Sequence, residues 1–330
     1  MPAPSILFLE VDAEDAASVR KHFPDVDIVE RVLEGDALVQ RAENAAVISC
    51  FIHTPFPAEV LRALPKLRLL CTRSVGYDHI DLHACHSMGV MVCNVPDYGS
   101  HVIAEHVFAL LLSTLRHVPE ADTRVHRGVF DYHGLRGMAL RGKTIGIVGT
   151  GKIGRHVAAI AHGFGMNILA VDTCRTLEIV ERFGVRYVSF DVLLAASDIV
   201  TLHVPASKET EHMINDAAIA AMRPGSVIVN TARGSLIDST ALLKGLESGK
   251  IAHALLDVLE HEQNFTEHRE LITHPRVVTT PHIAFYADDS MRNMYLDTFQ
   301  SIDQWNAGQE PDHVVHPLRV VCDLPGVRKA

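Results

Sequence analysis

The sequence predicts two doubly wound α/β domains, each built on a parallel sheet. Short apolar runs alternate with helical patterns almost from end to end, which is typical of parallel strands joined by crossover helices. At 330 residues the chain is too long for one hydrophobic core and suits two domains. Its 48% hydrophobic and 21% charged residues are an ordinary globular composition.

Four apolar runs near the beginning of the chain predict the strands of a first sheet. They are separated by helical patterns, so we expect the strands to be parallel. The predicted strands are residues 5–11, 45–50, 67–72 and 90–94, and the predicted helices are 13–23, 58–64 and 79–88.

A second series of strands begins near residue 143. It comprises residues 144–148, 168–171, 199–202, 226–230, 252–256 and 277–279. Six strands are the number of the doubly wound dinucleotide fold. A long helical pattern over residues 101–117 connects the two series, and the tail from residue 287 begins with another helix. We therefore expect a domain of residues 100–286 inserted in a domain formed by residues 1–99 and 287–330, with a cleft where the chain crosses between them.

Composition excludes several classes of partner. The net charge is −10 and no long basic stretch is present, so we expect no nucleic-acid surface. The longest apolar run, residues 102–115, is shorter than the roughly 18 residues of a membrane span, so we expect no membrane partner. None of the six cysteines has CxxC spacing, so we expect no metal site. We interpret the cysteines as small buried residues in a reducing compartment. Without a signal-peptide pattern, this predicts a cytoplasmic protein.

A glycine loop follows the first strand of the second series. Gly149, Gly151 and Gly154 form the pattern GxGxxG, with a strand before it and a helical stretch after it. The first glycine permits a tight turn, the second lets the backbone approach a pyrophosphate, and the third allows close helix–strand packing. A glycine-rich turn without a ligand is the alternative, but the strand–loop–helix context favours a Rossmann dinucleotide site.

An acidic residue selects the dinucleotide. Asp172 ends the next strand, 18 positions beyond Gly154, close to the spacing of roughly 20 in the fingerprint. A carboxylate there accepts ribose hydroxyls and repels a 2′-phosphate, so the sequence favours NAD. A strand-end cap is the alternative role for Asp172, and the nearby Arg175 leaves some NADP use open.

Polar residues follow the last three strands, at the sheet edge where ligands bind in open α/β sheets. Each has an ordinary explanation as a surface cation, a solvated acidic turn or a solvated histidine, and for Glu260 we prefer the solvated turn. Together, Arg233, Glu262 and His282 suit one reaction. A guanidinium binds a carboxylate bidentately, a histidine gives and takes a proton, and a neighbouring carboxylate stabilises the imidazolium. This set predicts reversible reduction of a 2-oxo acid to a 2-hydroxy acid.

Seven segments in order make the chain similar to the D-isomer-specific 2-hydroxyacid dehydrogenases along essentially its whole length. They are RSVGYDHID at 73–81, NVPDY at 94–98, GTGKIG at 149–154, LHVP at 202–205, NTARG at 230–234, LDVLEHE at 256–262 and TPH at 280–282.

The resemblance implies three catalytic residues. Arg233 would clamp the substrate carboxylate, and His282 would be the proton donor and acceptor with Glu262 as its partner. The spacing from Asp257 selects Glu262 over Glu260.

The resemblance also implies contacts to substrate and cofactor. Main-chain amides around Val75 and Gly76 would hold the substrate carboxylate. Tyr98 and Phe285 would form an aromatic wall suited to a small or apolar 2-oxo acid, although core packing is the alternative for Phe285. The expected cofactor contacts beyond the three glycines are Lys152 and Ile153 at the pyrophosphate, Asp172 at the adenine ribose, and His203, Val204, Pro205, Thr210, Thr231, Ala232, Arg233 and Asp257 at the nicotinamide side.

Within the family, PHIAFY at 281–286 resembles the D-lactate dehydrogenase branch. This implies reduction of pyruvate or a similar small 2-oxo acid with NADH. Hydroxypyruvate, glyoxylate or a branched 2-oxo acid is the alternative, and an NAD-sensing protein like the family's corepressors is the non-enzyme alternative. The helix 102–115 and the arm 118–141 resemble the family's dimer-forming region, which implies a homodimer.

Overall fold

The computed structural model describes residues 5–262, 264, 266–316 and, for the backbone, 327–329. The chain divides into two compact units, which we name unit 1 (residues 1–99 and 287–319) and unit 2 (residues 100–286 and 320–330). The assignment of substrate and cofactor roles to whole domains stays a prediction. Within the described ranges, no helix has the length and apolar character that a membrane crossing requires.

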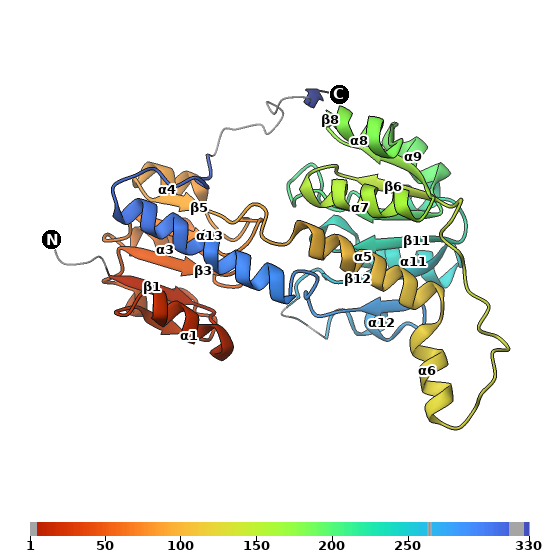
Figure 1. Cartoon of the computed structure of the whole chain (residues 1–330), viewed down its shortest axis with the longest axis horizontal. Coiled ribbons are helices and arrows are strands. Elements are labelled where there is room, and N and C mark those ends of the chain that lie inside the picture. Colours follow the sequence, from red (N-terminus) through yellow and green to blue (C-terminus); the bar gives the residue numbers. More distant parts are fainter. Residues whose placement is uncertain (1–4, 263, 265, 317–326, 330) are drawn as a thin grey trace. The chain divides into compact units, whose positions relative to one another are not determined.

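Unit 1 contains a five-stranded parallel sheet (Figure 1). Its order is β2 (Asp27–Val29), β1 (Ile6–Leu9), β3 (Val47–Cys50), β4 (Leu69–Thr72) and β5 (Met91–Cys93), which is the flavodoxin-type order 2-1-3-4-5. The sequence reading missed β2, because this edge strand has three half-buried residues and no apolar run. The helices are α1 (Ala13–His22), α2 (Gly35–Ala42), α3 (Ala58–Arg62), α4 (Leu82–Ser87) and α13 (Asp288–Asn306).

Unit 2 contains a seven-stranded parallel sheet rather than the six strands expected. Its order is β13 (Val277–Thr279), β12 (Ile251–Leu256), β11 (Ser226–Asn230), β10 (Ile199–Leu202), β6 (Thr144–Val148), β7 (Asn167–Val171) and β9 (Arg186–Tyr187). The unexpected strand is β9, whose two residues are too short to form an apolar run. The strand order reverses between β6 and β10, which makes their carboxyl ends the place for a ligand.

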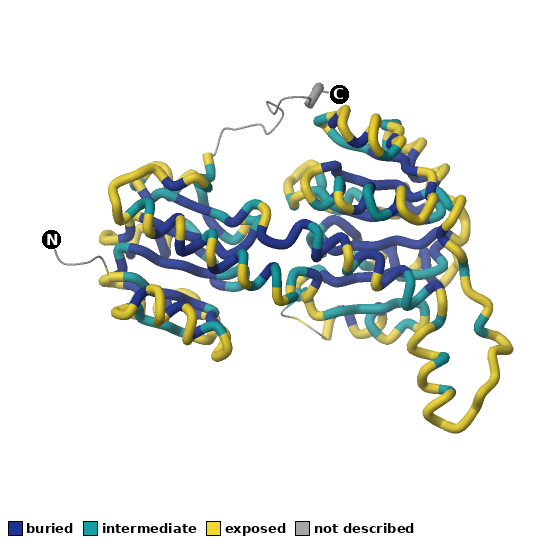
Figure 2. Tube along the Cα trace, viewed as in Figure 1, coloured by how far each residue is buried: buried dark blue, intermediate teal, exposed yellow. Residues whose placement is uncertain are grey.

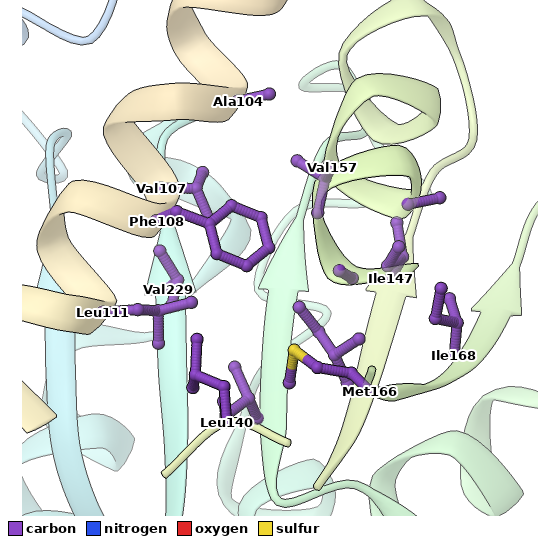
Figure 3. Close-up of a cluster of buried hydrophobic side chains, with 14 of the residues drawn as sticks. Ala104, Val107, Phe108, Leu111, Leu140, Ile147, Val157, Met166, Ile168 and Val229 are labelled. Carbon is purple, nitrogen blue, oxygen red and sulfur yellow. The ribbon is translucent and has the colours of Figure 1, made fainter. Parts of the chain in front are cut away.

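Hydrophobic cores cover both faces of the unit 2 sheet. Ile147 of β6 and Val229 of β11 belong to one buried cluster, whereas their strand neighbours Val148 and Ile228 belong to another. Successive side chains of a strand point to opposite faces, which explains the continuous apolar runs. Figure 3 shows the first cluster, in which Val107, Phe108 and other side chains of α5 gather with residues of the sheet and of α7. The helices are α5 (Ser100–Leu115), α6 (Val118–His126), α7 (Lys152–Gly163), α8 (Leu177–Phe183), α9 (Phe190–Ala196), α10 (Asp216–Ala221), the 3-10 helix η1 (Gly234–Leu236), α11 (Ser239–Glu247) and α12 (Arg269–Thr273).

The segment after α6 is exposed along most of its length (Figure 2). Phe130 is 94% exposed and Tyr132 is 79% exposed. These are two of the most exposed aromatic side chains among the described residues.

Two features of the chain differ from expectation. Residues 327–329 (β14) pair antiparallel with β8 (Cys174–Thr176) of unit 2, whereas we expected everything after residue 287 in the first domain. Among the strands that the structure describes, β8 pairs with β14 alone, so its backbone groups are available for this pairing. The second difference concerns cysteine. Cys50, Cys71, Cys85 and Cys93 are buried thiols as expected, but Cys174, half-buried at the start of β8, is disulfide-bonded.

Candidate active site

The glycine loop joins β6 to α7 and leaves no room for side chains at two of its glycines. Gly149 has a φ of +93°, and a Cβ there would lie 2.6 Å from the carbonyl oxygen of His203. A Cβ on Gly154 would lie 2.0 Å from the carbonyl oxygen of Gly149. Gly151, by contrast, caps the N-terminus of α7, and a Cβ there would meet no protein atom within 4 Å. The open space therefore lies at the helix N-terminus, where Lys152 and Ile153 begin the first turn and where free N–H groups are suited to an anion.

Asp172 follows β7 and forms hydrogen bonds with the glycine loop. Its Oδ2 accepts the main-chain N–H of Thr150 at 2.5 Å and the Thr150 hydroxyl at 2.9 Å, while its Oδ1 accepts the N–H of Cys174 at 2.8 Å. The Thr173 hydroxyl also donates to Oδ1, at a long 3.5 Å, so a ribose hydroxyl at this carboxylate would have to replace that contact. Sequence reasoning missed the role of Thr150, which also hydrogen-bonds to the hydroxyl of Tyr187 at 2.8 Å.

His203 follows β10 beside the glycine loop. Its main-chain N–H donates to the carbonyl of Val148 at 2.7 Å, and its Nε2 lies 2.9 Å from the hydroxyl of Thr201. Burial lowers the pKa of His203 to about 3, so the ring is uncharged at neutral pH. The adjacent Val204 lies against Gly149, because its Cγ1 would be 2.9 Å from a Cβ on that glycine.

The loops after β10 and β11 contain the other predicted cofactor residues. The hydroxyl of Thr210 donates to the carbonyl of Pro205 at 2.7 Å, which closes the first loop. The N–H of Ala232 donates to Oδ1 of Asn230 at 3.0 Å. The hydroxyl of Thr231 is buried and has no protein partner among the described residues. Since buried polar groups are nearly always paired, this hydroxyl fits a site that a ligand completes.

Arg233 lies in a turn that the neighbouring strand residue fixes. Nδ2 of Asn230 donates to the carbonyl of Arg233 at 2.8 Å, and Nη1 of Arg233 donates to the carbonyl of Ala232 at 2.8 Å. The turn therefore holds the guanidinium at the carboxyl end of β11.

His282 and Glu262 form the predicted pair. Nδ1 of His282 lies 3.0 Å from Oε2 of Glu262, so Nε2 is the ring nitrogen that does not face this carboxylate. His282 has a φ of +53°, which a non-glycine residue rarely adopts, and it lies in the segment that follows β13. The ring of Phe285 is edge-on to that of His282, with 6.4 Å between the centroids. Phe285 thus lies beside the His282 ring.

Asp257 holds the turn that carries His282. The placement of Asp257 on the nicotinamide side stays a prediction; its side chain is buried, and both of its oxygens accept hydrogen bonds. Oδ1 accepts the Thr280 hydroxyl at 2.5 Å and the N–H of Ile283 at 2.9 Å, and Oδ2 accepts the N–H of Ala284 at 2.9 Å.

Sequence reasoning missed His106 of α5. Its Nε2 lies 3.1 Å from the Thr280 hydroxyl and 3.6 Å from Oδ1 of Asp257. The available signal was a histidine interrupting the apolar run of residues 102–115. Glu260 also differs from expectation: it is mostly shielded and bonded to His212 and Ser239, not part of a solvated turn.

In unit 1, Val75 and Gly76 lie in the loop after β4. Nδ2 of Asn94 donates to the carbonyl of Val75 at 2.9 Å, and the Ser74 hydroxyl donates to the carbonyl of Gly76 at 2.5 Å. These bonds fix the turn. Tyr98 is 5% exposed, so most of its ring is packed within the protein.

The motif residue Arg73 is buried and holds the preceding strand ends of unit 1. Its guanidinium donates to the hydroxyl of Ser49 at 2.9 Å and to the carbonyls of Leu9 and Glu10 at 2.6 Å each. Arg73 therefore serves the scaffold around the Val75–Gly76 turn.

Among the described residues, one group is suited to hold a metal ion. The potential ligand atoms of His261, Glu267 and His268 lie within 4.8 Å of one another. None of the three belongs to the predicted catalytic set, and the expectation of a metal-free site stays a prediction.

Comparison with known proteins gives consistent matches. Residues 108–284 match the family described as D-isomer specific 2-hydroxyacid dehydrogenase, NAD binding domain. The chain is 34% identical over 98% of its length to the D-3-phosphoglycerate dehydrogenase of Archaeoglobus fulgidus, of which it spans only 60%. It is 36% identical to the glyoxylate reductase of Thermococcus litoralis, covering 88% of this chain and 86% of that one. The solved D-lactate dehydrogenase of Aquifex aeolicus, complexed with NAD and lactic acid, is similar with a TM-score of 0.87 and 32% identity, covering 94% of this chain and 99% of that one.

Proposed function

Because the chain belongs to the D-isomer-specific 2-hydroxyacid dehydrogenases, which are NAD-dependent oxidoreductases, we propose that it reduces pyruvate or a similar small 2-oxo acid to the D-2-hydroxy acid with NADH. The observation that carries the proposal is the pair His282–Glu262, 3.0 Å apart, with Phe285 beside the imidazole.

The residues of unit 2 account for the proton and for substrate binding. When bound, NADH supplies the hydride that reaches the carbonyl carbon of the 2-oxo acid. His282 donates the proton from Nε2 to the carbonyl oxygen, which becomes the hydroxyl, and takes it back in the reverse direction. Glu262 orients the ring through Nδ1 and stabilises the imidazolium. Arg233 binds the substrate carboxylate through its planar guanidinium.

The cofactor preference rests on Asp172. Its Oδ1 suits a ribose hydroxyl that replaces the long contact from Thr173, while its negative charge repels the 2′-phosphate of NADP. The glycine loop fits the pyrophosphate of NAD. The Thr231 hydroxyl, which has no partner among the described residues, fits the nicotinamide side. We expect at most weak activity with NADPH.

Substrate size is the finer part of the proposal. The aromatic ring of Phe285 beside His282 favours a small apolar substituent on the 2-oxo acid, as in pyruvate. The similarity to a glyoxylate reductase supports glyoxylate or hydroxypyruvate as the second candidate, and a branched 2-oxo acid remains the third. Substrate contacts by Val75, Gly76 and Tyr98 stay predictions.

A steady-state screen of pyruvate, glyoxylate, hydroxypyruvate and branched 2-oxo acids, each with NADH and NADPH, tests the proposal. We expect the highest kcat/KM for pyruvate with NADH, and a kcat about 10²–10⁴-fold lower in His282→Ala. Fast turnover of hydroxypyruvate without turnover of pyruvate would refute the substrate assignment. NADH binding without turnover of any 2-oxo acid would instead support the NAD-sensing alternative.

We also propose that the protein is a homodimer. The exposed side chains of Phe130 and Tyr132, in the arm after α6, support this proposal, because such aromatic groups are normally covered. The cytoplasmic location stays a prediction.

A further inference from the structure

Glu260 connects three loops at the carboxyl edge of the unit 2 sheet. It lies two residues before Glu262, in the segment after β12. Its Oε1 lies 2.5 Å from Nε2 of His212, which belongs to the loop after β10. Its Oε2 accepts the main-chain N–H of Ser239 at 3.0 Å and the Ser239 hydroxyl at 2.5 Å, at the start of α11. One carboxylate thus joins the loops that follow β10, β11 and β12.

The same loops are in direct backbone contact. Gly234 follows Arg233, and a Cβ on it would lie 2.0 Å from the carbonyl of Leu259 and 2.4 Å from the main-chain nitrogen of Glu260. The N–H of His212 donates to the carbonyl of Ser235 at 2.8 Å. The turn that presents Arg233 therefore lies against the backbone that leads to Glu262, and Glu260 fixes how the two meet.

Charge strengthens this arrangement. The hydrogen bond that His212 donates to Glu260 raises the pKa of His212. Burial opposes this effect, and the negative charges of Asp238 and Glu211 add to it. Burial alone would raise the pKa of Glu260, but the hydrogen bonds from Ser239 and His212 lower it overall. Asp238 is itself engaged as the N-cap of α11, where it accepts the N–H groups of Thr240 and Ala241. The pair is therefore an ion pair until His212 loses its proton, and its charge–charge attraction is lost as the pH rises through the pKa of His212.

We infer that Glu260 is a positioning residue that, together with His212 and Ser239, sets the separation of Arg233 from the His282–Glu262 pair and loosens its hold when His212 loses its proton. The inference rests on the proposed reductase function. A displaced Arg233 meets the substrate carboxylate poorly, so KM for the 2-oxo acid should rise. The glycine loop, where the pyrophosphate is expected, makes none of these contacts, so NADH affinity should change less than KM.

The first experiment measures kcat and KM for pyruvate, and Kd for NADH, in three variants: Glu260→Gln, His212→Gln and Ser239→Ala. Glu247→Gln is the matched control, because it makes the same chemical change on an exposed residue at the end of α11. We expect Glu260→Gln to raise KM about tenfold, within the ~10²-fold that a misplacement of 1 Å can cost. The Kd for NADH should rise by a smaller factor than KM, and Ser239→Ala should give a smaller rise in KM. A KM equal to that of the control would overturn the inference. So would a loss of NADH affinity that parallels the rise in KM, since that pattern indicates general disruption.

A pH series distinguishes positioning from a merely structural role. In the wild type, KM for pyruvate should rise as His212 deprotonates. In His212→Gln, which is neutral at all pH values, this component should be absent and KM should already be raised at low pH. An identical pH dependence of KM in the two proteins would contradict the inference.

The third measurement needs no turnover. A ¹⁵N-imidazole NMR titration should show a lower His212 pKa in Glu260→Gln than in Glu247→Gln. A wild type that turns over no 2-oxo acid would defeat the proposed function alone. An unchanged His212 titration in Glu260→Gln would defeat the inference, whatever the enzyme reduces.

Discussion

Replacing Gly151 by alanine tests whether the open space at the N-terminus of α7 is a pyrophosphate site. A Cβ on Gly151 meets no protein atom within 4 Å, and its φ of −63° suits any residue. The substitution should leave the fold intact and, by restricting the unfolded chain, change stability by no more than about 0.4–1 kcal/mol in the stabilising direction. The added methyl group occupies the place where the backbone must approach the phosphates. We expect NADH to bind about 10- to 100-fold more weakly, which is about 1.4–2.8 kcal/mol of binding free energy.

Two further glycines of the same segment provide comparisons, one for the binding of NADH and one for stability. Gly163→Ala, at the other end of α7, also meets open space and should leave the Kd for NADH unchanged. Gly154→Ala places a Cβ 2.0 Å from the carbonyl oxygen of Gly149, so the loop must move by about 1 Å, and the protein should lose about 1–3 kcal/mol of stability. The assays are calorimetric titration with NADH and chemical denaturation of each variant. Wild-type NADH affinity in Gly151→Ala would refute the assignment of this space to the cofactor.

Three more predictions follow from buried and exposed groups. Asp257→Ala leaves two N–H groups and the Thr280 hydroxyl without their acceptor. At about 1–3 kcal/mol for each group, the free energy of unfolding measured by urea denaturation should fall by about 3 kcal/mol or more. A fall of less than about 1 kcal/mol would contradict this account. Because the pKa of His203 is lowered to about 3, only the unfolded chain takes up this proton as the pH falls below about 6.5, so the free energy of unfolding should fall by up to about 1.4 kcal/mol per pH unit. His203→Asn should lack this component, and parallel pH–stability curves for the two proteins would exclude it. The double substitution F130S and Y132S should convert a dimer to a monomer in sedimentation experiments without loss of secondary structure, and an unchanged sedimentation coefficient would place the interface elsewhere.

The buried strands could be predicted because each leaves a local mark in the sequence. Hydrophobic clusters cover both sides of the sheet at β6, β10 and β11, so these strands are apolar on both faces. Each therefore appears in the sequence as a continuous apolar run, which can be recognised without knowing which strands pair with it. β2 and β9 are short and half-buried, so their formation depends on an edge that the rest of the sheet provides. The pairing of β8 with residues 327–329 is likewise long-range and leaves no periodic pattern.

The candidate site shows the same division between local and long-range information. The family spacing selected Glu262 as the partner of His282, and the two side chains are in contact. The same segment contains Asp257 and Glu260, and spacing alone did not reveal what these two carboxylates hold. Their partners, Thr280 and Ser239 among them, lie more than twenty positions away. Only the folded chain brings these donors to the carboxylates.

Backbone strain identifies where that long-range structure is needed most. Among the described residues, five non-glycine residues have positive φ, and His212, His261 and His282 all lie in segments after β10, β12 and β13 at one edge of the unit 2 sheet. Such conformations cost about 1–3 kcal/mol each and persist only where surrounding contacts enforce them. At His282 the enforcing contacts come from Asp257, whose three side-chain hydrogen bonds, at about 1.5–3 kcal/mol each for a charged acceptor, exceed that cost. The buried carboxylate therefore holds His282 in a conformation that its own backbone disfavours. For this reason the orientation of His282 should depend on Asp257 as much as on Glu262.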